Sequence, residues 1–164
     1  MRSSVFLALL LLAGCEHPAK TDEKPAADTP TPTPTPAPAN GPKVVITTPS
    51  GDITVNVEVV STEAKIERGL MYRQAMALDA GMLFLLPEVK DWTFWMRNTL
   101  IPLDMIFIAR DMTIAGIVEN AEPRTETMRQ VERPSLYVLE VNGGFSAAHK
   151  IAQGAKVQFD GVPR

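Results

Sequence analysis

Cysteine and histidine are scarce in this sequence, and their scarcity excludes several kinds of site. The 164 residues include one cysteine, Cys15, and two histidines, His17 and His149. No disulfide can form within the chain, and the part after Cys15 has no thiol nucleophile. One cysteine and two histidines supply too few ligands for a zinc site of the Cys and His type. The sequence lacks a Gly-x-Ser-x-Gly motif, and only His149 could activate a serine there, so a Ser-His-Asp hydrolase is not expected.

An excess of positive charge and long apolar runs are also lacking. The formal net charge is −3. No basic patch or basic tail is present, so nucleic acid is not expected as a partner. The apolar run at residues 5–12 is far shorter than the stretch of about 20 residues that a membrane-spanning helix needs.

The first fifteen residues have the features of a bacterial secretory signal. Arg2 supplies a positive charge, residues 5–12 have the length of a signal h-region, and Leu12-Ala13-Gly14 leads into Cys15. This order resembles the lipobox of bacterial lipoproteins, in which small residues precede an invariant cysteine. The resemblance implies removal of residues 1–14, diacylglycerol on the Cys15 thiol and a further acyl chain, such as palmitate, on the new N-terminus. Two or more acyl chains anchor a protein stably in a membrane. The alternative is an ordinary signal peptide with an incidental cysteine.

Residues 15–42 are expected to be the lipidated cysteine followed by a disordered, proline-rich tether. Eight of the fourteen prolines lie between residues 16 and 42, and a Thr-Pro repeat covers residues 29–36. Proline fixes φ and removes a backbone donor, which favours extended polyproline II over helix or sheet. At about 3.1 Å per residue the tether would reach roughly 80 Å. It is interpreted either as a spacer or as a leader without a length requirement.

Residues 43–164 are expected to form a single globular, β-rich domain. Residues 53–59 alternate apolar and polar side chains, as a half-buried strand does. Gly81 precedes a buried strand that Pro87 should end, Arg110-Asp111 should form a hairpin turn, and residues 120–133 should be loop. The expected strands cover residues 44–47, 53–59, 82–86, 92–97, 104–109, 113–119, 136–141 and 156–159, and the expected helices residues 62–72 and 146–151. Together they predict a mostly β fold, either β-barrel-like or a compact sandwich, with one or two short α-helices.

Three stretches of this domain occur together in one family. They are residues 68–73 (RGLMYR), 81–84 (GMLF) and 94–104 (FWMRNTLIPLD), with a further Leu-Glu element at Leu139-Glu140. The domain resembles a widespread prokaryotic family known only as domain of unknown function number one hundred and ninety-two. The resemblance covers about residues 43–160 and implies a small, mostly β fold, often secreted or lipid-anchored. It implies no established activity.

The polar residues of these stretches, with one tryptophan, are the candidate ligand-binding residues. They are Arg68, Arg73, Trp95, Arg97, Asn98, Thr99, Asp104 and Glu140. Loops at strand ends commonly present binding groups, and a tryptophan ring beside polar side chains suits a sugar or a carboxylate. The alternative is structural: Asp104 would pair with Arg97 or Arg73, and Asn98 would bond the backbone of a tight loop.

Carboxylates and methionines in the domain suggest two further chemistries. Asp91, Asp104 and Glu140 are candidate carboxylates for a glycosidase, which needs two of them about 5–9.5 Å apart in a cleft. Thioethers can hold Cu(I), but methionine is commonly a core residue. The methionines considered for copper, beside Trp95, are Met71, Met76, Met82, Met96 and Met105.

The sequence therefore predicts a non-enzymatic binding module, tethered to a membrane through its lipidated N-terminus, for a small ligand, a cell-wall glycan or an envelope protein. A carbohydrate-active enzyme using carboxylates and a methionine-based copper-binding protein are the alternatives. No catalytic residue, metal site or cofactor is assigned. The expected location is the bacterial cell envelope, facing the periplasm, and Glu16 after Cys15 favours the outer membrane by analogy.

Overall fold

A computed structural model of the chain describes residues 41–163. The expected signal peptide, the lipidated Cys15 and the tether up to residue 40 lie outside the described residues. Within residues 41–163, no helix has the length and hydropathy required to cross a bilayer.

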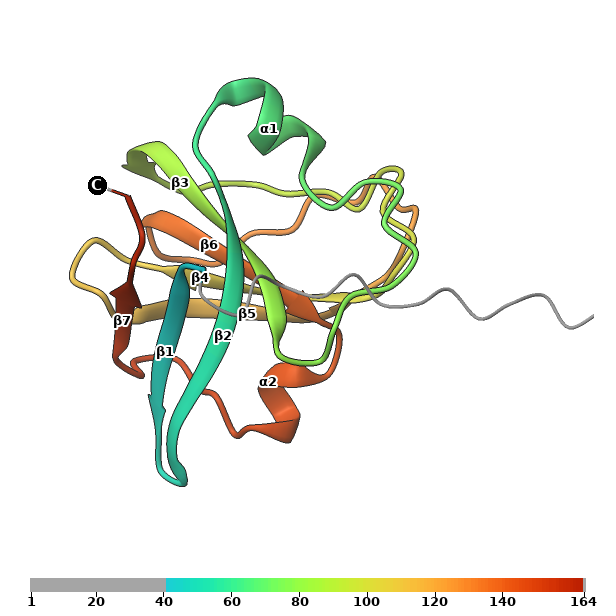
Figure 1. Cartoon of the computed structure of the whole chain (residues 1–164). Helices are drawn as coiled ribbons and strands as arrows, with labels where there is room; N and C mark the ends of the chain where they lie inside the picture. Colours follow the sequence, from blue (N-terminus) through green and yellow to red (C-terminus); the bar gives the residue numbers. More distant parts are fainter. Residues whose placement is uncertain (1–40, 164) are drawn as a thin grey trace, which may run out of the picture. The chain divides into compact units, whose positions relative to one another are not determined.

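The domain is built from seven strands and two short helices, which confirms the mostly β prediction (Figure 1). The strands are β1 (Lys43–Thr48), β2 (Gly51–Val60), β3 (Ala80–Lys90), β4 (Leu103–Ile108), β5 (Ile114–Ala121), β6 (Ser135–Asn142) and β7 (Val157–Asp160), and the helices are α1 (Glu63–Arg68) and α2 (Phe145–Ala148). All strands belong to one sheet in the order β5-β4-β6-β3-β2-β1-β7. The sheet curls into a half-barrel, and an isolated bridge between Thr113 and Lys156 links the regions next to its two edge strands.

One pair of strands is parallel, which the sequence did not predict. β2 and β3 run parallel, with Asn56 opposite Ala80, whereas every other neighbouring pair is antiparallel. Parallel neighbours need a crossover connection. The crossover here is residues 61–79, which contain α1, and it carries that helix to one end of the sheet (Figure 1).

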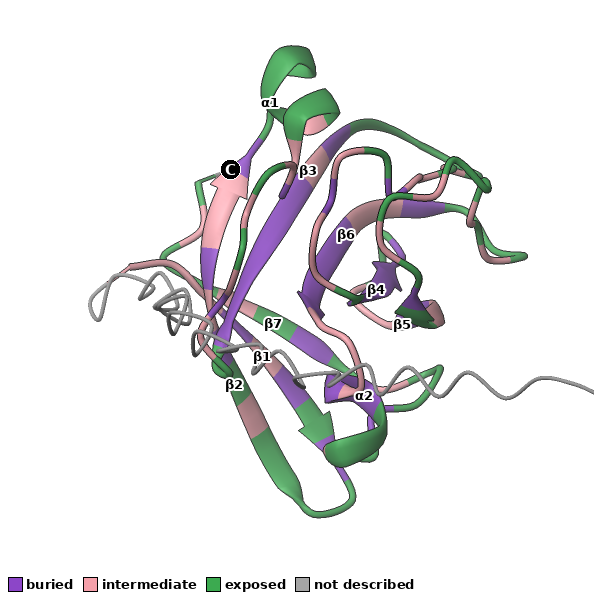
Figure 2. Cartoon of the chain, turned by 90° about the vertical axis from the view of Figure 1, so that its right-hand side faces the viewer, coloured by how far each residue is buried: buried purple, intermediate pink, exposed green. Residues whose placement is uncertain are grey.

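The sheet is buried on both faces in its middle (Figure 2). In β4, Met105 and Phe107 pack into one apolar cluster, while Ile106 and Ile108 pack into a second cluster. Successive side chains of a strand point to opposite faces, so the two clusters lie on opposite sides of the sheet. β6 divides its side chains in the same way, with Val138 in the first cluster and Leu139 in the second.

Several expected elements differ from the structure, and α2, expected at residues 146–151, covers Phe145–Ala148. β3 continues through Pro87 to Lys90, and α1 ends at Arg68 because Gly69 follows it with φ +44°. Residues 92–97, expected to be a strand, form a loop. In that loop Phe94 makes only an isolated bridge, exchanging hydrogen bonds of 2.9 and 2.8 Å with Arg129. The aromatic-rich pattern of this segment is typical of a strand, but its backbone partners belong to another loop.

A buried carboxylate ties three segments of the domain together. Asp104 of β4 is fully buried. Its Oδ1 accepts hydrogen bonds from the backbone N–H groups of Asn120 (2.8 Å) and Gly144 (2.9 Å). Its Oδ2 accepts one from the N–H of Ser146 at 2.7 Å. Asp104 therefore fixes the end of β5 and the start of α2 against β4.

Asp104→Asn tests this role. The amide preserves volume but replaces one accepting oxygen by a donor, so we expect the free energy of unfolding to fall by about 2 kcal/mol. Urea denaturation measures the change, and Asp160→Asn, at an exposed position of β7, is the matched control. If both variants unfolded at the wild-type urea concentration, the hydrogen bonds that Asp104 accepts would not contribute to stability.

Candidate functional site

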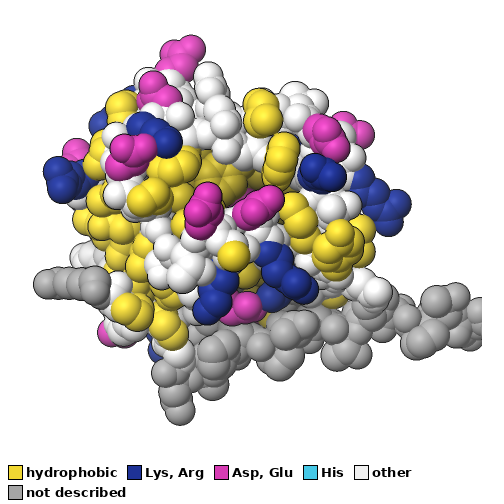
Figure 3. Space-filling model, turned by 90° about the horizontal axis from the view of Figure 1, so that it is seen from above, with side chains coloured by type: hydrophobic (Ala, Val, Ile, Leu, Met, Phe, Trp, Pro, Cys, Tyr) yellow, Lys and Arg dark blue, Asp and Glu magenta, His cyan; other side chains and the backbone are white. Residues whose placement is uncertain are grey.

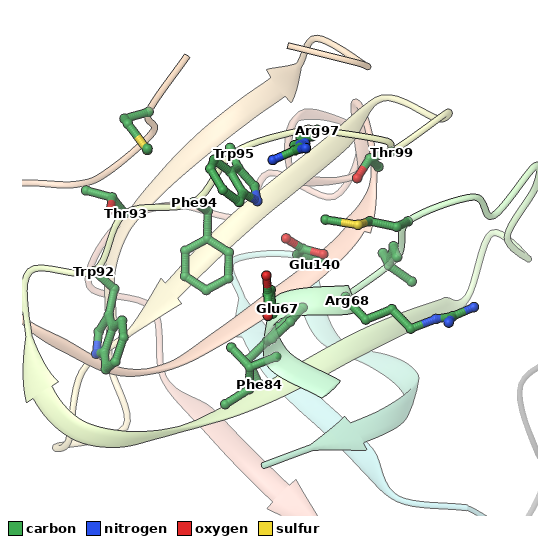
Figure 4. A pocket seen from close by; sticks show the side chains of 15 residues that line it. Glu67, Arg68, Phe84, Trp92, Thr93, Phe94, Trp95, Arg97, Thr99 and Glu140 are labelled. Atoms are coloured by element: carbon green, nitrogen blue, oxygen red, sulfur yellow. The ribbon is translucent and has the colours of Figure 1, made fainter. Parts of the chain in front are cut away.

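A pocket of about 250 Å³ lies where α1 and the turn after it meet the loop at residues 92–99 (Figure 4). Its walls come from segments far apart in the sequence. The lining residues are Ile66, Glu67, Arg68, Gly69, Leu70, Met71, Phe84, Trp92, Thr93, Phe94, Trp95, Arg97, Thr99, Met128 and Glu140. Most of them are apolar or aromatic, as is usual for a site that buries a small molecule.

The α1 wall depends on a glycine. Gly69 has φ +44°, a conformation that glycine adopts at little cost. A Cβ at this position would lie 3.4 Å from Cζ of Phe84. That is an ordinary contact distance, so the backbone conformation accounts for the glycine, while Ile66 packs against the apolar cluster beneath.

The opposite wall is a loop held by aromatic packing. The Phe94 ring makes edge-to-face contacts with Phe84, at 5.4 Å between centroids, and with Phe107, at 5.8 Å. The carbonyl of Asn98, which has φ +56°, accepts a hydrogen bond of 2.8 Å from the N–H of Tyr72. This bond joins the loop to the turn after α1, so both walls of the pocket are connected.

Glu140 of β6 contributes a buried carboxyl group to the pocket. The residue is 4% exposed and lies in register between Met82 on β3 and Met105 on β4. Neither neighbour can pair with a carboxylate. Within residues 41–163 no group donates a hydrogen bond to this carboxyl group, and burial raises its pKa to about 8. Glu140 is therefore mostly a neutral carboxylic acid at pH 7.

The charged residues at the pocket lie at its exposed rim. Glu67, Arg68 and Arg97 are exposed, and Figure 3 shows acidic and basic side chains around apolar ones on the end of the domain that carries α1. The Arg97 guanidinium lies 3.7 Å from the Glu126 carboxylate and 5.8 Å from the centroid of the Trp95 ring. Such an exposed ion pair stabilises the fold little, and Arg97 remains available to a ligand.

Five of the eight residues proposed from the sequence line this one pocket. They are Arg68, Trp95, Arg97, Thr99 and Glu140. They come from α1, the 92–99 loop and β6, and Figure 4 shows them around a common space. Whether they bind a ligand stays a prediction.

The other three proposed residues lie elsewhere. The Arg73 guanidinium makes a two-bond ion pair with Glu58, at 2.6 and 2.9 Å. The Asn98 side-chain amide points to the Met71 sulfur at 3.9 Å. Asp104 pairs with neither Arg73 nor Arg97 but accepts the three backbone bonds described above.

The carboxylates considered for a glycosidase do not share a cleft. Asp104 is opposite Val141 in the β4–β6 ladder, and Glu140 is opposite Met105. Asp104 and Glu140 therefore point to opposite faces of the sheet. Asp91 is exposed and does not line the pocket. Glu67, which the sequence interpretation missed, does line it together with Glu140.

Four of the methionines considered for copper lie in the core. Met76, Met82, Met96 and Met105 belong to the first apolar cluster, whereas Met71 lines the pocket. In the described part of the chain, no group of three or more His, Cys, Asp or Glu side chains is placed to hold a metal ion.

A second hollow, of about 690 Å³, lies near the C-terminal end of the described chain. Its lining residues are Leu85, Leu86, Met112, Leu136, Tyr137, Phe159, Gly161, Val162 and Pro163. No carboxylate or basic side chain lines it, so the first pocket is the candidate functional site.

The raised pKa of Glu140 predicts a pH-dependent stability. Between about pH 4.5 and pH 8 the folded protein keeps the Glu140 proton that the unfolded chain loses. The free energy of unfolding should therefore fall as pH rises through this window, by up to about 5 kcal/mol, and level off above it. Glu140→Gln removes this titration, so its stability relative to wild type should increase with pH. Urea denaturation at several pH values measures the difference, with Glu119→Gln, exposed on β5, as the control. A constant difference for Glu140→Gln would show that the carboxyl titrates normally.

Comparisons with known proteins place the domain in a family. Residues 45–159 match the family model DUF192, described as "Uncharacterized ACR". A crystal structure from Sinorhizobium meliloti 1021, described as "a putative transcription regulator", is 40% identical, with a TM-score of 0.70 over 74% of this chain and 95% of that chain. A protein of unknown function from Novosphingobium aromaticivorans DSM 12444 is 39% identical, with a TM-score of 0.70 over 77% of this chain and 93% of that chain. No curated protein matches the chain. The matched residues and the shared fold show that the chain belongs to the uncharacterized DUF192 family.

Proposed function

We propose that this protein is a membrane-tethered binding module of the bacterial envelope, and that it holds a small ligand in the pocket beside α1. The observation that carries the proposal is a buried carboxyl group, Glu140, that opens into an aromatic-lined pocket without an internal partner. The Glu140 oxygens are not among the fully enclosed, unpaired side-chain atoms of the described residues, so their hydrogen-bond partners can come from the pocket. A ligand with a complementary polar group would satisfy Glu140 and cover the apolar walls at the same time.

The shape and composition of the pocket support binding of a small ligand over docking of a protein. A site of about 250 Å³ lined by Phe84, Trp92, Phe94 and Trp95 suits a compact molecule with an apolar face. The exposed Arg68 and Arg97 at the rim can orient its polar substituents.

A second candidate function, a carbohydrate-active enzyme, is favoured by one observation. Glu67 and Glu140 line the same pocket, and the pKa of Glu140 is raised to about 8, a value suited to a general acid near neutral pH. In that mechanism Glu140 would protonate a leaving group while the exposed Glu67 activated water. Binding without turnover is the preferred proposal because Glu67 is held by no other side chain of the described chain.

Ligand-dependent thermal unfolding tests the binding function. We expect one class among sugars, muropeptides, carboxylates and amines to raise the midpoint by several degrees, since a ligand at 100 times its Kd stabilises by about 2.7 kcal/mol. Trp95→Leu should lose this shift because it removes a pocket wall. Tyr72→Leu, an exposed aromatic residue outside the lining, should keep it.

The outcomes separate the candidate functions. An equal shift in Trp95→Leu and wild type, or no shift with any compound, would contradict binding in this pocket. Chromatography of the same sugars after incubation distinguishes the two candidates, because an enzyme converts them and a binding module returns them unchanged.

The tether has its own test. In a bacterial host, the wild-type protein should incorporate labelled palmitate and sediment with membranes, because acylation at Cys15 anchors it. Cys15→Ser should lose both properties, and Glu16→Gln, at the next residue, should keep them. Membrane sedimentation of Cys15→Ser equal to that of wild type would contradict lipid anchoring.

A further inference from the structure

We propose that the ligand of the pocket is a small organic ammonium compound, whose cationic group pairs with the Glu140 carboxylate inside a cage of aromatic rings. This inference rests on the proposed binding function and specifies the chemical class of the ligand. It is drawn from the pocket lining, the surroundings of Glu140 and the placement of the arginines (Figure 4).

Glu140 lacks an internal cation. Its neighbours across the sheet, Met82 and Met105, are apolar, and within residues 41–163 no lysine or arginine forms an ion pair with it. A carboxylate in such a place is costly unless it is paired, and the attraction of an opposite charge is strong where water is excluded. A cationic ligand that enters the pocket supplies the opposite charge that pairs with the Glu140 carboxylate.

The rings around Glu140 suit the same ligand. Phe84, Phe94 and Trp95 line the pocket, and the face of an aromatic ring attracts a cation, most strongly when it is desolvated. Trp95 already has the Arg97 guanidinium at 5.8 Å from its ring centroid, which shows a cation accommodated beside that ring. Alkylated ammonium groups also tolerate an apolar cavity because their charge is covered by carbon.

The arginines at the rim do not make an anionic ligand the better choice. The Arg68 guanidinium points away from Glu140, and that of Arg97 lies 3.7 Å from Glu126. The Glu67 carboxylate in the lining would repel an anion that entered the pocket, and Glu140 would do so once it ionises.

Binding of a cation at Glu140 is coupled to loss of a proton. The charged residues that line the pocket with this carboxyl are Glu67 and Arg97, together with Arg68, whose guanidinium points away from it, while β3 and β4 place methionines beside it. Below about pH 8 the Glu140 proton must leave when the cation binds, so affinity should rise with pH and level off above that value.

Choline and its uncharged carbon analogue, 3,3-dimethyl-1-butanol, test the charge requirement in the purified full chain. Titration calorimetry and tryptophan fluorescence, which reports on Trp92 and Trp95, measure the affinity of each compound. We expect choline to bind about tenfold or more tightly than the alcohol. Glu140→Gln should abolish the preference, and Glu119→Gln should keep it. For wild type, choline affinity should increase by up to about tenfold per pH unit between pH 6 and pH 8.

Four results would overturn the inference. If the alcohol bound as tightly as choline, or if choline affinity were independent of pH, Glu140 would not select a cation. If neither compound bound but a neutral sugar or a carboxylate bound in a Trp95-dependent way, the ligand class would be wrong and the binding function would stand. If no compound of any class bound, both proposals would fail together.

Discussion

The candidate site depends on a carboxyl group placed in the middle of a sheet that is apolar on both faces. Glu140 lies on β6 between two methionines, beneath the junction of α1 and the 92–99 loop. An apolar residue at this position would complete the first core cluster. The carboxyl group instead interrupts it and opens into the pocket, so its burial carries a free-energy cost that a ligand cation or a bound proton relieves.

The surrounding structure holds this arrangement open without filling it. The parallel β2–β3 crossover brings α1 to one end of the sheet, and Gly69 ends the helix beside the Phe84 ring. On the other side, Phe94 fixes the loop through edge-to-face contacts. Asp104 acts on the opposite face. Its carboxylate accepts hydrogen bonds from backbone N–H groups and thereby fixes β5 and α2 against β4. Two acidic residues on paired strands thus differ in role, one structural and one facing the candidate site.

The sequence predicts the strands well where one pattern dominates and poorly where tertiary partners decide. Alternation in residues 53–59 correctly indicates β2. The run at residues 92–97 has a strand-like pattern but is a loop, because Phe94 makes only an isolated bridge, with Arg129 of another loop. For the site, the motifs indicate Trp95 and Glu140. Nothing local marks Glu67, and the GMLF motif does not show that its Phe84 lines the same pocket, because these residues come from distant elements. Sequence spacing alone also cannot show that Asp104 and Glu140 point to opposite faces of the sheet, because the register between β4 and β6 determines it.

The most direct test of this account is a carbon-13 NMR titration of the Glu140 side-chain carboxyl, assigned with Glu140→Gln, with and without choline. In the free protein the carboxyl should titrate near pH 8, because burial disfavours its charged form, and saturating choline should move the midpoint to lower pH. A midpoint near the ordinary value of 4.5 in the free protein, or one that choline leaves unchanged, would contradict a buried, cation-seeking carboxyl at the base of the pocket.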